Sequence, residues 1–374
     1  MSDYSLKRHF DGGCARELAR HIEPVMPDFD TQGYVAEVDA RVGPLELKDR
    51  VLVLTQGLRT RLPQSYPDAV NVLLESLGPE LGEGEGMFNT SWYLMPVARY
   101  VEEFGLDHPE VSLAAIDQIT RRHTGEYAIR PYLRDHHQLT MDTVRQWAGS
   151  PSLNVRRLAT EGIRPRLPWA PKFAPFILDP GPVIEILDHL IDDPSPYVRK
   201  SVANNLNDIS RDHPDQAVKT ARRWLASSNS DRTRWITRHG LRTLIKNGDT
   251  AALAVVGASA DPAVMVTGLS VSPKAIKVGD ALTINAVVKN EADGPKDVVV
   301  DYSIHFRGRD GRTRPRVFKL TRVQLDPGQS SHVHKTHVLR QLKSRTYYPG
   351  THAVNVQVNG TPSAPVNFVL EVPS

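Results

Sequence analysis

Two segments of the chain, PSLNVRR at residues 151–157 and PSPYVRK at residues 194–200, show the same pattern 43 positions apart. Each segment begins a series of apolar residues at helical spacing. A second echo, AIRPYL at 128–133 and GIRPRL at 162–167, has an offset of 34 residues. Repeats of roughly 35 to 47 residues built from helix pairs are typical of HEAT and armadillo proteins, which stack into a curved solenoid with a concave binding surface. The echoes therefore predict an all-α, HEAT-like repeat solenoid around these segments.

The helical pattern extends outward from the repeats in both directions. A third echo, which begins at Thr233, aligns with the copy at Val198, and Gly248 follows the last apolar series as a helix stop signal. We therefore expect one HEAT-like helical domain over residues 1–258. The predicted helices are 13–22, 34–42, 45–61, 66–77, 91–104, 111–122, 124–134, 139–148, 152–163, 181–192, 196–210, 214–227 and 231–246.

After residue 262, helical spacing gives way to alternating apolar and polar residues that are separated by turn sequences such as Asp-Pro-Gly. About seven short strands in a segment of this length are typical of an immunoglobulin-like β-sandwich. We therefore expect a multidomain protein in which the solenoid is followed by an all-β immunoglobulin-like domain over residues 263–374. The predicted strands are 264–270, 282–289, 297–306, 316–323, 331–338, 351–358 and 366–372.

Composition excludes several classes of protein. The 374 residues include one cysteine, Cys14, so no internal disulfide can form, and no zinc-type spacing of Cys and His accompanies it. We expect neither a metal site nor another cofactor. The N-terminal residues lack the apolar stretch of a signal peptide, and no run of about 18 apolar residues occurs. These features predict a protein of the reducing bacterial cytoplasm that does not associate with a membrane.

The formal net charge of +3 conceals an uneven distribution along the chain. Residues 1–110 carry 10 basic and 19 acidic residues, whereas residues 111–262 carry 21 and 16, and residues 263–374 carry 15 and 8. A one-sided basic surface favours a polyanion as partner; the alternative is a solvated basic face without such a partner. The densest basic cluster is segment 307–316, which is suited to phosphates, although the same charges would keep an exposed hairpin soluble. Its arginines are Arg307, Arg309, Arg312, Arg314 and Arg316.

Three acidic residues stand among the basic residues of the repeats. Glu126 lies at the start of a predicted helix, Glu161 lies one turn from Arg157, and Asp208 lies near the end of another helix. If each acid lies on the inner helix of its repeat, three carboxylates face one concave surface. The alternative is that they form surface or inter-repeat ion pairs, which solenoids use freely. The residues expected around them are Arg130, Arg157, Arg164, Arg166, Arg199, Lys200, Arg238, His239 and Trp169.

Three segments carry a resemblance to a known family: EYAIRPY at 126–132, NVRRLATEGIRPRLPW at 154–169 and YVRKSVANNLND at 197–208. They resemble the AlkC branch of the bacterial AlkC/AlkD DNA glycosylases, and the resemblance covers roughly residues 1–250. It implies a HEAT-like glycosylase that excises N-alkylated bases, notably 3-methyladenine and 3-methylcytosine, from duplex DNA without flipping the base into a deep pocket. Some members of the branch carry an immunoglobulin-like C-terminal domain. The AlkD branch frames its site with tryptophans, and because the matching turn here has Asn204, we do not expect that aromatic cage.

The chemistry of such a reaction fits the acidic residues independently. Alkylation at a ring nitrogen makes the base cationic and weakens the N-glycosidic bond, and departure of the base leaves an oxocarbenium-like sugar. A protein assists with negative charge beside C1′ and with a held water, as carboxylates do in glycoside hydrolysis. We assign these roles to Glu161 and Asp208 first and to Glu126 next, and one of the three orients or deprotonates the water.

The remaining candidates are expected to hold the DNA. Trp169 is predicted to pack on the deoxyribose or on the cationic base, where cation–π attraction favours the alkylated form. Basic side chains are predicted to bind phosphates, which position the lesion without reading its sequence. The residues assigned to the DNA backbone are Arg130, Arg157, Arg164, Arg166, Arg199, Lys200, Arg238, His239, Arg309, Arg312 and Arg314. The expected partner is double-stranded DNA with N-alkylated bases, bound by a monomer.

Two other functions compete with this hypothesis. A non-catalytic HEAT scaffold that binds a protein or a nucleic acid would explain the repeats and the basic surfaces, but it gives no use for acids within a basic groove. Such a scaffold would bind alkylated and normal duplex alike and release no base. A metal-dependent nuclease is a weaker alternative, because the sequence lacks the tight clusters of His and Asp ligands that such enzymes use.

Overall fold

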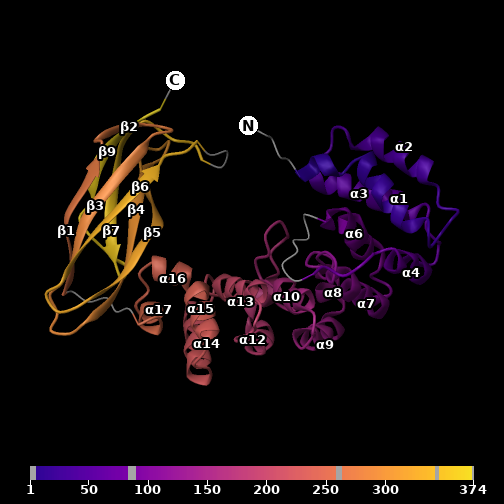
Figure 1. Ribbon diagram of the computed structural model, residues 1–374, viewed down its shortest axis with the longest axis horizontal. Helices are drawn as coiled ribbons and strands as arrows, with labels where there is room; N and C mark the ends of the chain where they lie inside the picture. The colour runs from indigo at the N-terminus through magenta and orange to yellow at the C-terminus, as the bar shows by residue number, and fades with distance from the viewer. Residues whose placement is uncertain (1–5, 83–89, 258–262, 342–344, 373–374) are drawn as a thin grey trace. The chain divides into compact units, whose positions relative to one another are not determined.

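The structure, a computed structural model, describes residues 6–82, 90–257, 263–341 and 345–372. The chain divides into two compact units. The first comprises the chain up to Ile209 together with Ser230–Ile236, and the second comprises Ser210–Asn229 and the chain from Thr237 onward. Helices form the N-terminal part and strands the C-terminal part, which confirms the predicted order (Figure 1). The predicted boundary between the two domains, at residues 258–262, lies outside the described residues.

The helices of the first unit follow the predicted series closely. In α1, for example, the carboxylate of Asp11 accepts a hydrogen bond from the backbone N–H of Gly13 at 2.8 Å and thereby caps the helix. Cys14, Leu18 and Ile22 of α1 form its buried face. The elements are η1 Leu6–His9, α1 Gly12–Ile22, α2 Thr31–Val42, α3 Leu47–Arg59, α4 Tyr66–Glu75, η2 Trp92–Leu94, α6 Met95–Phe104, α7 Pro109–Thr120, α8 Arg130–Asp135, α9 His137–Ala148, α10 Leu153–Glu161, α11 Ala174–Leu178, α12 Gly181–Asp188, α13 Pro196–Ile209 and the first part of α15 Asp231–Gly240, whose residues from Thr237 onward belong to the second unit.

Prolines shift several helix ends from their predicted positions. The helix predicted over 124–134 begins only at Arg130, because Pro131 belongs in the first turn of a helix, and residues 126–129 form a turn. Glu126 therefore precedes the helix that contains Arg130. The helix predicted over 152–163 ends at Glu161, and the proline-rich segment 162–173, which we call the Trp169 loop, follows it. The first copy of the 34-residue echo thus spans a turn and the start of α8, whereas the second copy lies in the Trp169 loop.

The 43-residue echo has a clear structural basis. Arg156 donates hydrogen bonds to the carbonyl oxygens of Ser150 and Pro151, at 2.9 and 3.0 Å. Arg199 donates to the residues at the same offsets, the carbonyl oxygens of residues 193 and 194, at 2.9 and 2.7 Å. Each arginine therefore holds the turn that precedes its own helix. The two helices, α10 and α13, pack against each other through buried apolar side chains such as Val155 and Val202.

The second unit combines helices α14 Pro214–Ser227, α16 Arg242–Lys246 and α17 Thr250–Val255 with two β-sheets. The helix predicted over 231–246 is interrupted between Gly240 and Arg242. Hydrogen bonds tie the helical segment to the sheets: Gln357 donates to the carbonyl oxygen of Lys246 at 3.1 Å, and Arg322 donates to that of Val256 at 3.0 Å. None of the described helices is long and apolar enough to cross a membrane.

All seven predicted strands are present, together with the short strands β2 and β8. One sheet has the order β1-β3-β6, and the other has the order β2-β9-β7-β4-β5 with β8 paired to β7. The turn between β4 and β5 spans only residues 308–312, so Arg314 and Arg316 lie on β5 rather than in a loop. The strands are β1 Val264–Ser272, β2 Ala275–Lys277, β3 Ala281–Asn290, β4 Lys296–Arg307, β5 Thr313–Leu325, β6 Ser330–Val338, β7 Gly350–Val358, β8 Thr361–Pro362 and β9 Val366–Glu371.

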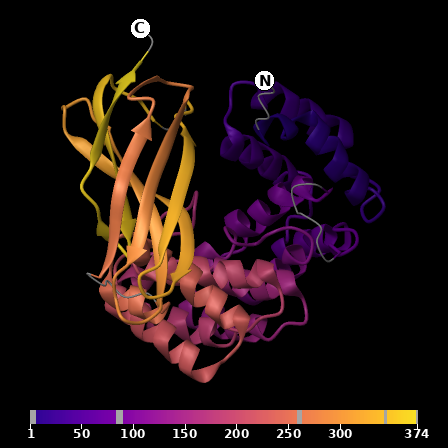
Figure 2. The same ribbon diagram turned by 60° about the vertical axis from the view of Figure 1, so that its left-hand side comes forward.

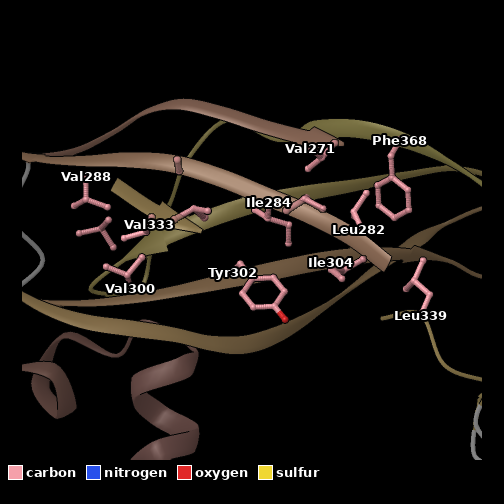
Figure 3. Close-up of a cluster of buried hydrophobic side chains, with 14 of the residues drawn as sticks. Val271, Leu282, Ile284, Val288, Val300, Tyr302, Ile304, Val333, Leu339 and Phe368 are labelled. Carbon is pink, nitrogen blue, oxygen red and sulfur yellow. The ribbon is translucent and has the colours of Figure 1, made fainter. Parts of the chain in front are cut away.

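Apolar side chains from both sheets form the core of the β-domain. Burial alternates along β3, so that Leu282 and Ile284 point inward while their neighbours are more exposed. Val300 and Ile304 of β4 meet them from the other sheet (Figure 3). The two layers of strands can be followed in Figure 2. This alternation is the pattern that the sequence predicted for a sandwich.

Candidate active site

Arg164, in the Trp169 loop, joins two of the three predicted carboxylates. Its Nη1 lies 2.6 Å from Oε1 of Glu161, and its Nε lies 2.8 Å from Oδ2 of Asp208. Glu161 is the last residue of α10, and Asp208 lies near the end of α13. All three side chains are more than nine-tenths buried. The packing of α10 on α13 therefore brings together two acids that lie 47 positions apart in the sequence.

Arg157 connects Glu126 to this pair. Its Nη1 lies 2.8 Å from Oε2 of Glu126, and its Nη2 lies 3.7 Å from Oε1 of Glu161. The guanidinium also lies over the ring of Tyr197, with Cζ 4.6 Å from the ring centroid. Arg164 and Arg157 thus hold all three carboxylates in one cluster, which we call the acid cluster.

Electrostatics keep Glu161 ionised despite its burial. Burial alone would raise the pKa of this carboxyl, but the charges of Arg157 and Arg164 and the hydrogen bond from Ser201 outweigh it and lower the pKa. Conversely, burial would lower the pKa of Arg157, and Glu126 with Glu161 raise it above its usual value. Glu161 is therefore a carboxylate at neutral pH, suited to stabilise positive charge and unsuited to donate a proton.

A relay of hydrogen bonds supports Glu161 from the α13 side. Ser201 donates to Oε2 of Glu161 at 2.7 Å, and Thr160 donates to the Ser201 hydroxyl at 2.6 Å. Asn205 donates to the backbone carbonyl of Thr160 at 2.9 Å. All of these side chains are buried. Ser201 at Oε2 and Arg164 at Oε1 thus give each oxygen of Glu161 a donor, which fixes the direction of the carboxylate.

Trp169 is presented to solvent by the Trp169 loop. Its side chain is 66% exposed, and its backbone is in the left-handed region with φ of 64°. Arg130 donates to backbone carbonyls of this loop, so its guanidinium is turned toward the protein. A depression of about 630 Å³ between α7 and α9, lined by Leu113 and Trp147 among others, contains none of these residues.

Comparison with known proteins identifies the family. Residues 117–244 match a family model described as a DNA alkylation repair enzyme, and residues 265–372 match one described as the C-terminal Ig-like domain of the uncharacterised protein YhaZ. The uncharacterized protein YhaZ of Bacillus subtilis is 33% identical over 97% of this chain and 98% of its own length. The solved structure of Pseudomonas fluorescens alkylpurine DNA glycosylase AlkC, bound to DNA containing an abasic site analog, is 34% identical. It covers 98% of this chain and 99% of its own, with a TM-score of 0.91.

The chain belongs to the AlkC family of DNA glycosylases. The resemblance that the three sequence segments carry is therefore confirmed, as is the immunoglobulin-like character of the C-terminal domain. For this AlkC-family chain, the match extends over both the helical part and the sheets.

The structure divides the predicted DNA-binding residues into two groups. Arg130, Arg157, Arg164 and Arg199 have guanidinium nitrogens within hydrogen-bond distance of carboxylates or carbonyls of the protein itself. Lys200 is exposed on α13, Arg166 is partly exposed in the Trp169 loop, and Arg238 and His239 are the last basic residues of α15. In the second unit, Arg309, Arg312 and Arg314 are exposed at the β4–β5 hairpin, where Arg314 lies 3.3 Å from Asp310.

Sequence reasoning gave no role to several residues of the site. Ser201, Asn205 and Tyr197 lie on the face of α13 that meets α10 and the acid cluster. Their spacing from Asp208, at intervals of three and four residues, marks one helical face. That stripe is the signal that points to them, and it becomes readable once Asp208 is taken as a site residue.

Proposed function

We propose that this chain hydrolyses the N-glycosidic bond of N-alkylated bases, 3-methyladenine and 3-methylcytosine among them, in duplex DNA. The relative from Pseudomonas fluorescens is named an alkylpurine DNA glycosylase and was solved on abasic DNA, the product type of such a reaction. The acid cluster carries the proposal for this chain. DNA is a polyanion, so a buried group of carboxylates at its binding surface opposes binding unless it serves the reaction.

The charge of the acid cluster suits a cationic transition state. In the ion pairs described above, three carboxylates share two guanidinium groups, so carboxylates outnumber guanidinium groups among these contacts. Because Glu161 and Asp208 are buried and held by donors, their field is fixed before the substrate arrives. A preorganised charge in a low-dielectric site stabilises developing positive charge more than water does.

The reaction proceeds by loss of the base and addition of water. The C1′–N bond breaks, its electron pair neutralises the alkylated base, and the sugar becomes oxocarbenium-like. Water then adds to C1′ and gives up a proton to the Glu126 carboxylate, which passes it to solvent. We assign the electrostatic role to Glu161 and Asp208, whose side chains are 7% and 3% exposed, and the water to Glu126, which at 13% is the most exposed of the three.

The remaining assignments follow from exposure. Trp169 contacts the lesion or its sugar, and the exposed basic residues Lys200, Arg309 and Arg312 hold phosphates. Arg157 and Arg164, by contrast, serve to hold the carboxylates. We further propose that the enzyme works as a monomer on chromosomal DNA, which in a bacterium lies in the cytoplasm.

The deciding experiment measures release of free base from methylated duplex DNA in the presence of a chelator. We expect the wild-type protein to release 3-methylated bases and Glu161→Gln to release them on the order of 100 times more slowly. Glu185→Gln is the control, because this exposed carboxylate on α12 lies outside the acid cluster, 3.9 Å from Arg145. Binding of undamaged duplex should be unchanged in both variants. Normal DNA binding without base release by the wild type would instead identify a scaffold.

A further inference from the structure

The backbone at Trp169 is held in a conformation that its residue type disfavours. A φ of 64° is uncommon for any residue with a Cβ, and it is costly for a bulky one. The same residue exposes 66% of a large apolar side chain to solvent. Such a backbone persists only where the surroundings determine it. The contacts of the Trp169 loop show what those surroundings are.

The tip of the loop is tied from two distant helical regions. Lys48 of α3 donates a hydrogen bond to the carbonyl oxygen of Trp169 itself. The hydroxyl of Tyr127, in the turn before α8, donates to the carbonyl oxygen of Pro168 at 3.3 Å. Both ties use the backbone of the loop, so the indole ring is left unobstructed.

A single guanidinium closes the base of the loop. Nη1 of Arg130 donates to the carbonyl oxygens of Gly162 and Arg164, at 3.3 and 2.9 Å, and Nη2 donates to that of Pro171 at 2.9 Å. These acceptors lie on both sides of Trp169 in the sequence. The Arg130 guanidinium also lies over the ring of Phe173, with Cζ 5.0 Å from the centroid. Arg130 therefore links the two ends of the segment that carries the tryptophan.

We propose that Arg130, assisted by Lys48, is a positioning residue that presets Trp169 for stacking on the damaged nucleotide, and that Arg130 does not bind a phosphate. The inference rests on the proposed function, in which Trp169 contacts the lesion. It extends that function by naming what holds the tryptophan. Because Arg130 also fixes the carbonyl of Arg164, whose guanidinium joins Glu161 to Asp208, the same residue couples the stacking group to the acid cluster.

The variant Arg130→Lys distinguishes between two roles of Arg130, holding the Trp169 loop and binding a DNA phosphate. Lysine keeps the positive charge that a phosphate needs, but one ammonium cannot reproduce a planar fork that reaches three carbonyls. We expect Arg130→Lys to lower the single-turnover rate of base release by about 10-fold to 100-fold, as misplacement of a positioning group does. Affinity for undamaged duplex and its salt dependence should stay at the wild-type values. Arg134→Lys is the matched control, since Arg134 lies on the same helix and is 66% exposed.

A double-mutant cycle ties the effect to the tryptophan. If Arg130 acts through Trp169, the rate of Trp169→Ala combined with Arg130→Lys should lie close to that of the slower single variant, because the two effects share one cause. Lys48→Met, at an exposed site, should change the rate in the same direction by less. A near-wild-type rate for Arg130→Lys, or a salt slope about 0.9 smaller in Arg130→Gln, would overturn the proposal in favour of a phosphate contact.

Limited trypsin digestion measures how well the Trp169 loop is held, and it does so independently of base release. The loop contains two cleavable bonds, after Arg166 and after Lys172, whereas the bonds after residues 130 and 164 precede proline and resist trypsin. We expect both loop bonds to be cut faster in Arg130→Lys than in Arg134→Lys, at an unchanged thermal midpoint. Equal cleavage of the loop in Arg130→Lys and Arg134→Lys would show that Arg130 does not hold the loop, even if the wild-type protein releases bases. Faster cleavage in Arg130→Lys, together with no base release by the wild type, would support the role of Arg130 in holding the loop and would reject the proposed function.

Discussion

Two buried arginine–carboxylate groups lie around α10 and α13 of the first unit, and they differ in the number of carboxylates that they contain. Arg156 pairs with Asp193 at 2.6 Å, with the two side chains 15% and 2% exposed. Arg164 pairs with Asp208 at 2.8 Å, with the two side chains 9% and 3% exposed. The first pair is balanced and also holds the turn before α13, through the hydrogen bond from the backbone N–H of Ser195 to Asp193. The second belongs to a group with an extra carboxylate.

The difference between the Arg156–Asp193 pair and the acid cluster shows how the same kind of ion pair can serve either the repeat structure or a candidate site. Arg156 and Arg157 are adjacent in the sequence, but on a helix they point about 100° apart. Arg156 therefore reaches the turn before α10 and Asp193 before α13, and Arg157 reaches Glu126 and Glu161. At the position 43 residues after Glu161 the chain has Asn204, so the second copy lacks this acid. We infer that the additional carboxylates around Arg157 and Arg164, rather than burial or ion pairing alone, distinguish the site.

The largest effect on base release is expected when a carboxylate of the acid cluster is removed, and removal of the carboxylate of the Arg156–Asp193 pair is the comparison. Asp208→Asn and Asp193→Asn each remove one charged partner of a buried guanidinium, so both should lose stability, by at most about 3 to 5 kcal/mol, and Asp208→Asn by less because Arg164 keeps its ion pair with Glu161. Only Asp208→Asn should lose base release, on the order of 100-fold to 1,000-fold, since it alone removes charge from the reacting centre. Thermal midpoints and single-turnover rates on methylated duplex measure the two effects. Rates that fall alike in the two variants would mean that the acid cluster is only a structural ion-pair group.

A smaller effect is expected at the hydrogen bond that supports Glu161. Ser201→Ala removes the donor to Oε2, and because a hydrogen bond to a charged group contributes about 1.5 to 3 kcal/mol, the rate should fall roughly 10-fold or more. Ser112→Ala removes a buried hydroxyl that donates to the carbonyl of Gly105, far along the chain from the acid cluster, and should leave the rate unchanged.

The dependence of the rate on pH provides a second test of the hydrogen bond from Ser201 to Glu161, because it predicts the direction in which the profile shifts. Arg157, Arg164 and Ser201 overcome burial and lower the pKa of Glu161, so activity that needs its charge is lost only as the pH falls through that lowered value. Loss of the Ser201 donor raises this pKa. The acid limb of the rate profile should therefore move to higher pH in Ser201→Ala, measured from pH 4 to 8, and should keep its wild-type position in Ser112→Ala. An unmoved limb in Ser201→Ala would remove Glu161 from the charged role.

The sequence predicts the frame of this molecule better than the partners of its charges. Strand alternation around Leu282 and Val300 and the apolar spacing of α13 are local patterns, and they locate nearly every element. The fate of Arg130, Arg157 and Arg164 depends instead on residues more than 30 positions away that only the fold brings near, such as Pro171 for Arg130 and Asp208 for Arg164. A basic residue in a sequence predicts an anionic partner, but it does not show whether that partner is a phosphate of DNA or a carboxylate of the protein itself. The sequence therefore singled out the three acids, whereas their ion pairs with Arg157 and Arg164 become visible only in the fold, and the roles of all five residues stay predictions.

Substitution of an exposed arginine in the β4–β5 hairpin should have the smallest effect. It should weaken DNA binding and leave base release unchanged, whereas variants of the acid cluster should do the reverse. Arg312 is exposed, unlike Arg157 in the acid cluster, so a phosphate can reach it. We expect Arg312→Ala to reduce affinity for damaged and undamaged duplex alike and to lower the slope of log affinity against log salt by about 0.9. Base release at saturating DNA should be unchanged, because the reacting centre keeps all its charges.

The control for this variant is Arg345→Ala, in the same unit. The guanidinium of Arg345 lies 4.4 Å from the ring centroid of Phe306, so it is engaged by the protein and should leave the salt slope unaltered. A slope that is unchanged in Arg312→Ala would make the hairpin a solvated surface rather than a DNA contact. A smaller slope with an intact rate would instead show that Arg312 contributes to DNA affinity through a phosphate contact and does not contribute to base release.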